Sequence, residues 1–141
     1  MSIWGTGSAQ FQFPGDSVVT LEHSTMQGDY ILPDIIEHKS IITGKKHFIN
    51  NGDYSEFTVN VYLYKYADAS AKFSEIYDYL HTNVYFWPHN DGKAISGSDS
   101  SPTEFFISDM SLSYLEDANY NDLLTIKFVA SDYTVVSKSL V

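Results

Sequence analysis

Five histidines are the side chains in this chain best suited to bind a transition metal, but their spacing matches no metal-binding motif. They are His23, His38, His47, His81 and His89. No two of them are four residues apart, as on one face of a helix, or two apart, as on one face of a strand. The sequence contains no cysteine, which excludes disulfides, thiol catalysis and cysteine-based zinc sites. We therefore predict no metal site.

The acidic residues and serines also lack the motifs of a catalytic site. No G-x-S-x-G nucleophile motif is present, and neither Gly-Thr-Gly-Ser at 5–8 nor Gly97-Ser98 is followed by the lysine and helix of a phosphate-binding loop. Most aspartates lie beside glycine, asparagine or serine, where turns favour them. We predict no catalytic residues and no cofactor, and hence a protein that is not an enzyme.

Composition narrows the class of protein further. The 141 residues include 18 acidic and 8 basic side chains, for a net charge of -10, which argues against a free-standing nucleic-acid binder. The 11 tyrosines, 9 phenylalanines and 2 tryptophans exclude global disorder. No apolar run reaches the ~20 residues of a membrane span, and the first residues do not resemble a secretory signal. The composition is that of a folded domain with an aromatic core.

Two strands and one helix are the clearest elements. Apolar residues alternate with polar ones over 56–66 and again over 124–128, which predicts two strands with one buried face each. Phe73, Ile76, Tyr77 and Leu80 follow the spacing of one helix face, which predicts a helix over about residues 69–81. We expect that helix face to pack on the apolar face of the first strand.

The remaining segments predict further short strands separated by turns. Gln27-Gly-Asp and Asn50-Asn-Gly-Asp are typical turn sequences, and Pro33 would confine its strand to a sheet edge or mark a break. The polar segment 92–103 is typical of a protruding loop. Eight to ten strands and one helix indicate an α+β, β-rich fold, an antiparallel β-sandwich or partly open barrel with one flanking helix.

The N-terminal segment differs from the rest of the chain. Residues 1–15 set three large aromatics, Trp4, Phe11 and Phe13, among glycines and small polar residues. A monomer that exposed these rings would present an adhesive patch, so we predict an extended assembly arm over 1–15 and a single β-rich domain over 16–141. The alternative is a first strand that folds back on its own sheet.

The order of elements from Asn51 to Val136 resembles the tail-tube and distal-tail (baseplate-ring) families of tailed bacteriophages. A polar turn leads into the strand Ser55-Glu-Phe-Thr-Val-Asn-Val-Tyr-Leu-Tyr, and the helix ends in Ile76-Tyr-Asp-Tyr-Leu80. A short strand, a loop, Glu104-Phe-Phe-Ile-Ser-Asp-Met and the strand Leu123-Leu-Thr-Ile-Lys-Phe follow. The segment 90–102 matches no feature of these families. The resemblance implies a β-sandwich with one flanking helix.

That resemblance also implies a function. It implies a non-enzymatic structural component of a phage tail tube, baseplate or neck, located in the virion. Its partners would be copies of itself in a ring, a hexamer, and neighbouring tail proteins, with DNA only as passing cargo and no membrane. The candidate subunit-interface residues are Trp4, Phe11, Phe13, Tyr62, Tyr64 and Trp87. Two alternatives remain open: a small β-sandwich module whose exposed aromatics bind a carbohydrate or another small ligand, and an enzyme with a pocket in a β-barrel.

Overall fold

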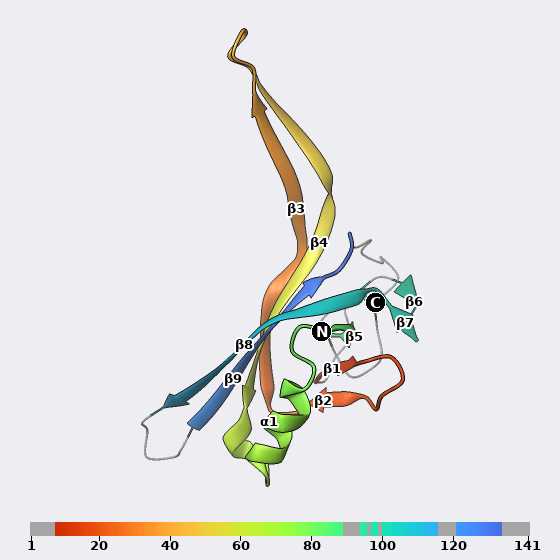
Figure 1. Cartoon of the computed structure of the whole chain (residues 1–141), viewed down its shortest axis with the longest axis vertical. Coiled ribbons are helices and arrows are strands. Elements are labelled where there is room, and N and C mark those ends of the chain that lie inside the picture. Colours follow the sequence, from red (N-terminus) through yellow and green to blue (C-terminus); the bar gives the residue numbers. More distant parts are fainter. Residues whose placement is uncertain (1–7, 89–93, 96, 99, 116–120, 134–141) are drawn as a thin grey trace.

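A computed structural model of the chain describes residues 8–88, 94–95, 97–98, 100–115 and 121–133. In chain order the elements are β1 (Ala9–Gln12), β2 (Val19–Leu21), β3 (Ser24–Lys39), β4 (Lys46–Tyr62), the 3-10 turn η1 (Leu63–Lys65), α1 (Ala69–Tyr77), β5 (Asn83–Trp87), β6 (Gly97–Ser98), β7 (Ser101–Pro102), β8 (Glu104–Leu115) and β9 (Asn121–Ala130). Figure 1 shows their arrangement.

Seven of these strands form one antiparallel sheet that curls into a half-barrel. The strand order is β2-β1-β5-β8-β9-β4-β3, and β6 and β7 form a separate two-stranded hairpin. The prediction of a β-rich α+β fold is thus confirmed, in its partly open barrel form. A sandwich is not formed by the described residues, because the second sheet has only two strands of two residues each.

The core lies on one face of this sheet. Every second residue is buried from Ser55 to Val61 in β4 and from Leu124 to Phe128 in β9, so the two predicted alternations are both present. Four phenylalanines form the centre of the core, Phe57, Phe86, Phe105 and Phe128, with the rings of Phe86 and Phe128 stacked at 4.4 Å. Because these four rings come from β4, β5, β8 and β9, they hold the middle of the sheet together.

The helix α1 begins as its sequence predicts. The Asp68 carboxylate accepts a hydrogen bond from the Ala71 amide at 3.0 Å and so caps the first turn. The helix ends at Tyr77 rather than at residue 81. Ile76 is fully buried, and Phe73 and Leu80 pack against the core, but Tyr77 is 52% exposed. The predicted face is therefore wrong at Tyr77, whose ring lies against Phe73 instead.

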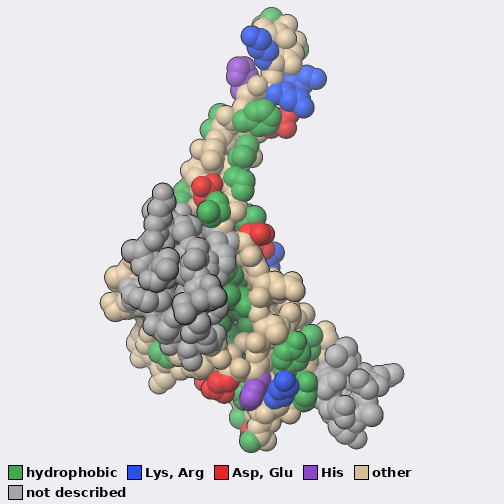
Figure 2. All heavy atoms as spheres, turned by 180° about the vertical axis from the view of Figure 1, so that it is seen from behind, with side chains coloured by type: hydrophobic (Ala, Val, Ile, Leu, Met, Phe, Trp, Pro, Cys, Tyr) green, Lys and Arg blue, Asp and Glu red, His purple; other side chains and the backbone are tan. Residues whose placement is uncertain are grey.

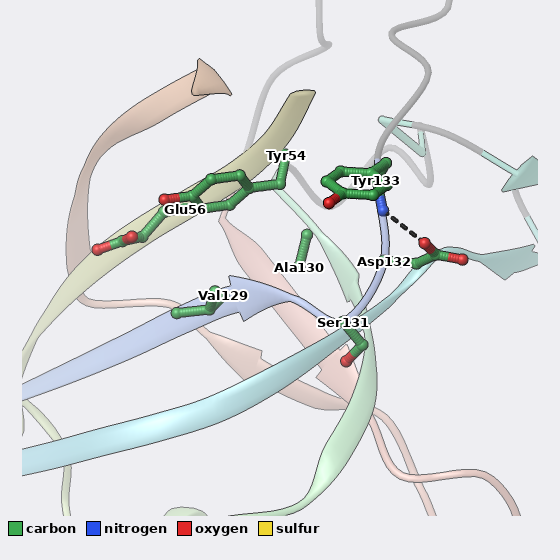
Figure 3. A pocket seen from close by; sticks show the side chains of 7 residues that line it. All are labelled: Tyr54, Glu56, Val129, Ala130, Ser131, Asp132 and Tyr133. Atoms are coloured by element: carbon green, nitrogen blue, oxygen red, sulfur yellow. Dashed lines mark hydrogen bonds between the residues drawn. The ribbon is translucent and has the colours of Figure 1, made fainter. Parts of the chain in front are cut away.

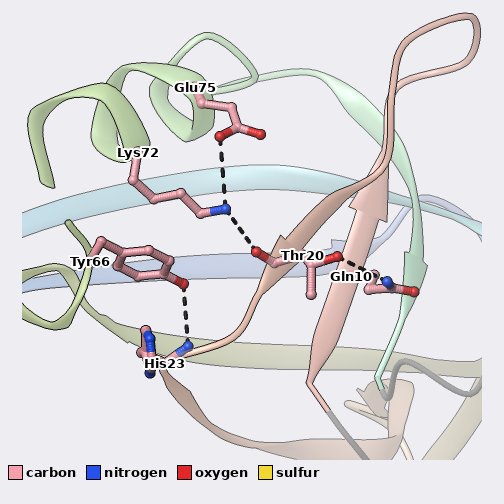
Figure 4. Close-up of polar contacts among 6 residues, drawn as sticks. All are labelled: Gln10, Thr20, His23, Tyr66, Lys72 and Glu75. Atoms are coloured by element: carbon pink, nitrogen blue, oxygen red, sulfur yellow. Dashed lines mark hydrogen bonds and ion pairs between the residues drawn. The ribbon is translucent and has the colours of Figure 1, made fainter. Parts of the chain in front are cut away.

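Polar contacts attach the helix to β2, a short edge strand of the sheet (Figure 4). The Lys72 ammonium donates a hydrogen bond to the Thr20 carbonyl at 2.9 Å and pairs with Glu75 at 3.7 Å. The same ammonium lies 5.1 Å from the centre of the Tyr66 ring, and the Tyr66 hydroxyl accepts a hydrogen bond from the His23 amide. The helix thereby covers this end of the sheet.

The N-terminal residues that the structure describes do not form an arm. β1 lies between β2 and β5, and Phe11 is fully buried against the rings of Tyr79 and Phe128. The prediction of an arm is wrong for residues 9–12, because burial of Phe11 in its own subunit offsets the cost of ordering the segment. Residues 1–7, with Trp4, lie outside the described part of the chain, and there the arm stays a prediction.

Three sequence signals for loops have other roles in the structure. Gln27-Gly-Asp lies inside β3 and Asn50-Asn-Gly-Asp inside β4, where Gly52 has a φ of +143°. Each segment lies in one strand of the β3–β4 hairpin and pairs with the other strand instead of forming a turn. In the predicted loop 92–103, Ala94 and Ile95 are buried in the core. The prediction that the whole segment protrudes is therefore wrong. Pro33 lies in the edge strand β3, as predicted.

Candidate assembly surfaces

The β3–β4 hairpin extends far beyond the sheet, as Figure 1 shows. β4 pairs with β9 from Tyr62 to Glu56, and its remaining residues pair only with β3. Residues 31–39 and 46–54 thus form a two-stranded ribbon, which at ~3.3 Å per residue is about 30 Å long. A ribbon of this kind is only marginally stable in water by itself. Its length therefore points to a contact outside the described chain.

Apolar side chains lie along both faces of this hairpin. Of the fourteen large hydrophobic residues exposed in the described part of the chain, seven lie on it: Ile31, Ile35, Ile36, Ile41, Ile42, Phe48 and Ile49. The two at the tip are almost fully exposed, Ile41 at 101% and Ile42 at 95%. Figure 2 shows hydrophobic side chains spaced along the projecting ribbon. Soluble monomers rarely expose so much apolar surface in one place.

The tip of the hairpin is basic, although the chain is acidic. Residues 38–47 contain Lys39, Lys45 and Lys46 and no acidic residue, a net charge of +3 with histidine neutral. The rest of the chain consequently carries -13, since the total is -10. One lysine of the three, Lys46, pairs with Glu37 at 3.3 Å. The tip thus joins exposed isoleucines to a local charge opposite to that of the remaining protein.

Two β-bulges lie where the hairpin leaves the sheet. In the first, Tyr30 and Ile31 of β3 lie opposite Ser55 alone. In the second, Asn51 and Gly52 of β4 lie opposite Asp34 alone. Bulges bend a strand and increase its twist. The two bulges are on opposite strands, so the register is restored beyond them, and the direction of the hairpin is set between them.

Beside these bulges lies a pocket of about 470 Å³ at the end of β9. Its lining residues are Tyr54, Glu56, Val129, Ala130, Ser131, Asp132 and Tyr133. Figure 3 shows the rings of Tyr54 and Tyr133 at its rim. Its Glu56 carboxylate pairs with the Lys127 ammonium at 2.9 Å, and this hydrogen bond raises the pKa of Lys127. The charge of Glu56 is thus balanced within the subunit.

The sheet has two long strand edges without a partner in the described part of the chain. β3 pairs only with β4, which leaves its outer edge free. β8 pairs with β5 at Glu104 to Phe106, and Ile107 bonds to the turn at His81 and Thr82. Beyond that point β8 pairs only with β9. A four-stranded unit, β8-β9-β4-β3, thus presents unpaired backbone groups on both sides.

The predicted interface residues fall into two groups. Phe11 and Trp87 are buried in their own subunit, Trp87 at 7% exposure, so neither is available in the folded subunit to a neighbouring one. Phe13, Tyr62 and Tyr64 reach the surface, and Phe13 stacks on Tyr79 with ring centres 6.1 Å apart. Trp4 lies outside the described residues. The structure brings together Tyr62 and Tyr64, whose ring centres lie 6.2 Å apart.

Tyr62 and Tyr64 do not lie in one plane. The rings of Tyr62 and Tyr64 are inclined at 74°, whereas stacking on a sugar needs exposed rings in one plane. The Lys65 ammonium lies 5.3 Å from the centre of the Tyr62 ring and 6.0 Å from that of Tyr64. Lys65 thus lies against both rings.

The hairpin is the surface that sequence reasoning missed. The signal was present in Tyr30-Ile-Leu-Pro-Asp-Ile-Ile-Glu and Lys39-Ser-Ile-Ile-Thr, where paired isoleucines place apolar side chains on both faces of a strand.

In the described residues, no three His, Asp or Glu side chains gather to hold a metal ion. No helix there has the length and apolar character needed to cross a membrane.

Comparisons with known proteins give a structural likeness but no match by sequence. No protein-family model matches the chain, and no curated protein matches it by sequence. Among solved structures, it is similar to a chain from the tail of an empty GTA particle with C6 symmetry, with 11% sequence identity and a TM-score of 0.48. The matched region covers 92% of this chain and 94% of that one.

Proposed function

We propose that this chain is a non-enzymatic structural component of a phage tail that assembles with copies of itself into a ring. The observation that carries the proposal is the projecting β3–β4 hairpin, with seven exposed apolar side chains and a basic tip. Such a surface is stabilised when another subunit covers it.

The strand edges supply a second contact between copies. Strand addition satisfies the unpaired backbone groups of an exposed edge. The edge of β3 in one copy pairs with the edge of β8 beyond Ile107 in the next copy. Because the two edges are different surfaces, the contact is head-to-tail, and it closes into a ring where the rotation between copies permits.

Charge favours the contact made by the hairpin. The tip carries +3, and the rest of a neighbouring copy carries -13. Opposite charges steer the tip toward its partner, and the exposed Ile41 and Ile42 then lose their contact with water. We propose that hairpins extend along the tail axis and contact the next ring.

The finer assignment rests on the resemblance in element order from Asn51 to Val136. From it we propose a hexameric ring in the tube, baseplate or neck of a tail, with neighbouring tail proteins as further partners. DNA is passing cargo in this proposal, and the protein resides in the virion. Phe13, Tyr62 and Tyr64 remain proposed interface residues because they are exposed or half-buried on the surface.

The test introduces charge at the hairpin tip. In the variant Ile41→Asp/Ile42→Asp, we expect single rings that do not stack, seen by sedimentation velocity and negative-stain microscopy, and a subunit of unchanged melting temperature. Val18→Asp is the matched control, because Val18 is an exposed aliphatic residue away from the hairpin, at 44% exposure. Assembly of the double variant equal to that of the control would contradict the proposed role of the hairpin.

A further inference from the structure

We infer that Tyr133 is a brace that fixes the direction in which the β3–β4 hairpin leaves the sheet. The importance of that direction for assembly rests on the proposed function, but the brace itself rests on contacts within one subunit. Tyr133 lies just beyond β9, at the point where β4 loses its third-strand support.

The joint that needs bracing lies between the sheet and the ribbon. The last pair between β4 and β9 is Glu56 with Val129. Immediately beyond it come the two bulges, the second of which sets Asn51 and Gly52 opposite Asp34. A two-stranded ribbon that starts at two bulges has no neighbouring strand to resist bending. Its direction must be held by contacts from elsewhere in the chain.

Tyr133 contacts both strands of the hairpin at the second bulge. Its hydroxyl donates a hydrogen bond to the Asp34 carboxylate of β3 at 2.7 Å. Its ring lies directly over Gly52 of β4, where an added Cβ would lie 2.6 Å from the ring carbon Cγ. One side chain therefore spans the two strands, and Figure 3 shows its ring beside β4 at the end of β9.

The residues at the bulge suit this contact. Gly52 has a φ of +143°, which side-chain-bearing residues rarely adopt, and its lack of a Cβ makes room for the ring. Asp34 lies opposite both Asn51 and Gly52 at the bulge, and its charged carboxylate is a strong acceptor for the Tyr133 hydroxyl. That hydrogen bond raises the pKa of Tyr133 above its ordinary value of 10.0, because only the protonated hydroxyl can donate to the carboxylate.

Distances between spin labels measure the direction of the hairpin without reference to assembly. The chain has no cysteine, so Thr43→Cys at the tip and Ser74→Cys on α1 give two unique labels. Labelled protein is diluted with unlabelled protein so that pulsed dipolar spectroscopy reports distances within one subunit. We expect a single narrow distance distribution for the otherwise unchanged chain.

Two variants remove the hydrogen bond of the brace, and a third is the control. Tyr133→Phe removes the donor and keeps the ring, while Asp34→Ala removes the acceptor. The control, Tyr77→Phe, removes the hydroxyl of a second exposed tyrosine, which lies on α1, away from the hairpin. We expect broader distributions for the first two variants and an unchanged one for Tyr77→Phe, with equal melting temperatures for all three.

The results separate the brace from the proposed function. Distributions for Tyr133→Phe and Asp34→Ala as narrow as that of Tyr77→Phe would overturn the brace, whether or not rings form. Broader distributions with unchanged ring assembly would support the brace and contradict the need for a fixed hairpin in assembly. Broader distributions with loss of assembly would support both.

Discussion

Replacement of Ile76 by alanine tests how the only α-helix in the described chain is held to the sheet. Ile76 is fully buried, and it is the one buried residue of α1. The change removes three carbons, which at ~0.8 kcal/mol each lose about 2.4 kcal/mol of burial free energy. The cavity left behind adds to this loss, so we expect a total of about 3–4 kcal/mol.

Urea unfolding followed by circular dichroism measures this loss. We expect a lower midpoint with an unchanged slope, and a melting temperature lower by roughly 10–15 °C for a domain of this size. The adjacent Tyr77→Ala is the matched control, because Tyr77 is 52% exposed and its loss should change stability by no more than about 0.5 kcal/mol. Similar losses for the two variants would refute the assigned helix face.

Three further predictions concern other parts of the fold. Phe11→Ala should lower the free energy of unfolding of the subunit by about 3–5 kcal/mol, because Phe11 is fully buried. An unchanged urea midpoint would show that β1 is not part of the subunit's core. Asp68→Ala should cost ~1 kcal/mol by thermal unfolding, because the Ala71 amide loses its cap, whereas Asp68→Asn should cost little. Burial raises the pKa of Tyr66 in the folded state. The stability that the neutral Tyr66 side chain contributes is therefore complete below the ordinary pKa of 10.0 and is lost as the pH rises through the higher pKa of the folded state. Between pH 8 and 11, the unfolding midpoint of Tyr66→Phe should consequently fall less steeply with pH than that of the unchanged chain. Identical slopes would contradict a raised pKa of Tyr66.

The strands with one buried face could be predicted from sequence because alternation reports burial directly. Phe57, Val59 and Val61 alternate with polar residues, and all three are fully buried in β4. The helix could be predicted because the spacing of its apolar residues is local, and α1 begins at Ala69, where the predicted range begins. Both features depend on neighbours in sequence, which is why the pattern is sufficient.

The hairpin and its joint could not be predicted in this way. Asn51 and Gly52 are typical of a turn, yet they form a bulge because β3 pairs with β4 on both sides of them. Whether such residues turn the chain or bulge depends on the partner strand, which local sequence does not specify. The contact of Tyr133 with Asp34 joins residues 99 positions apart, and no local pattern indicates it.

The most direct test of the proposed function is the oligomeric state of the full chain at high concentration. We predict rings in negative-stain images, and a native mass spectrum with six copies as the main species. The variant with Asp at positions 41 and 42 should lose the stacking of rings, because the isoleucine tip contacts the next ring. A full-length chain that stays monomeric at millimolar concentration and shows no rings would contradict the account.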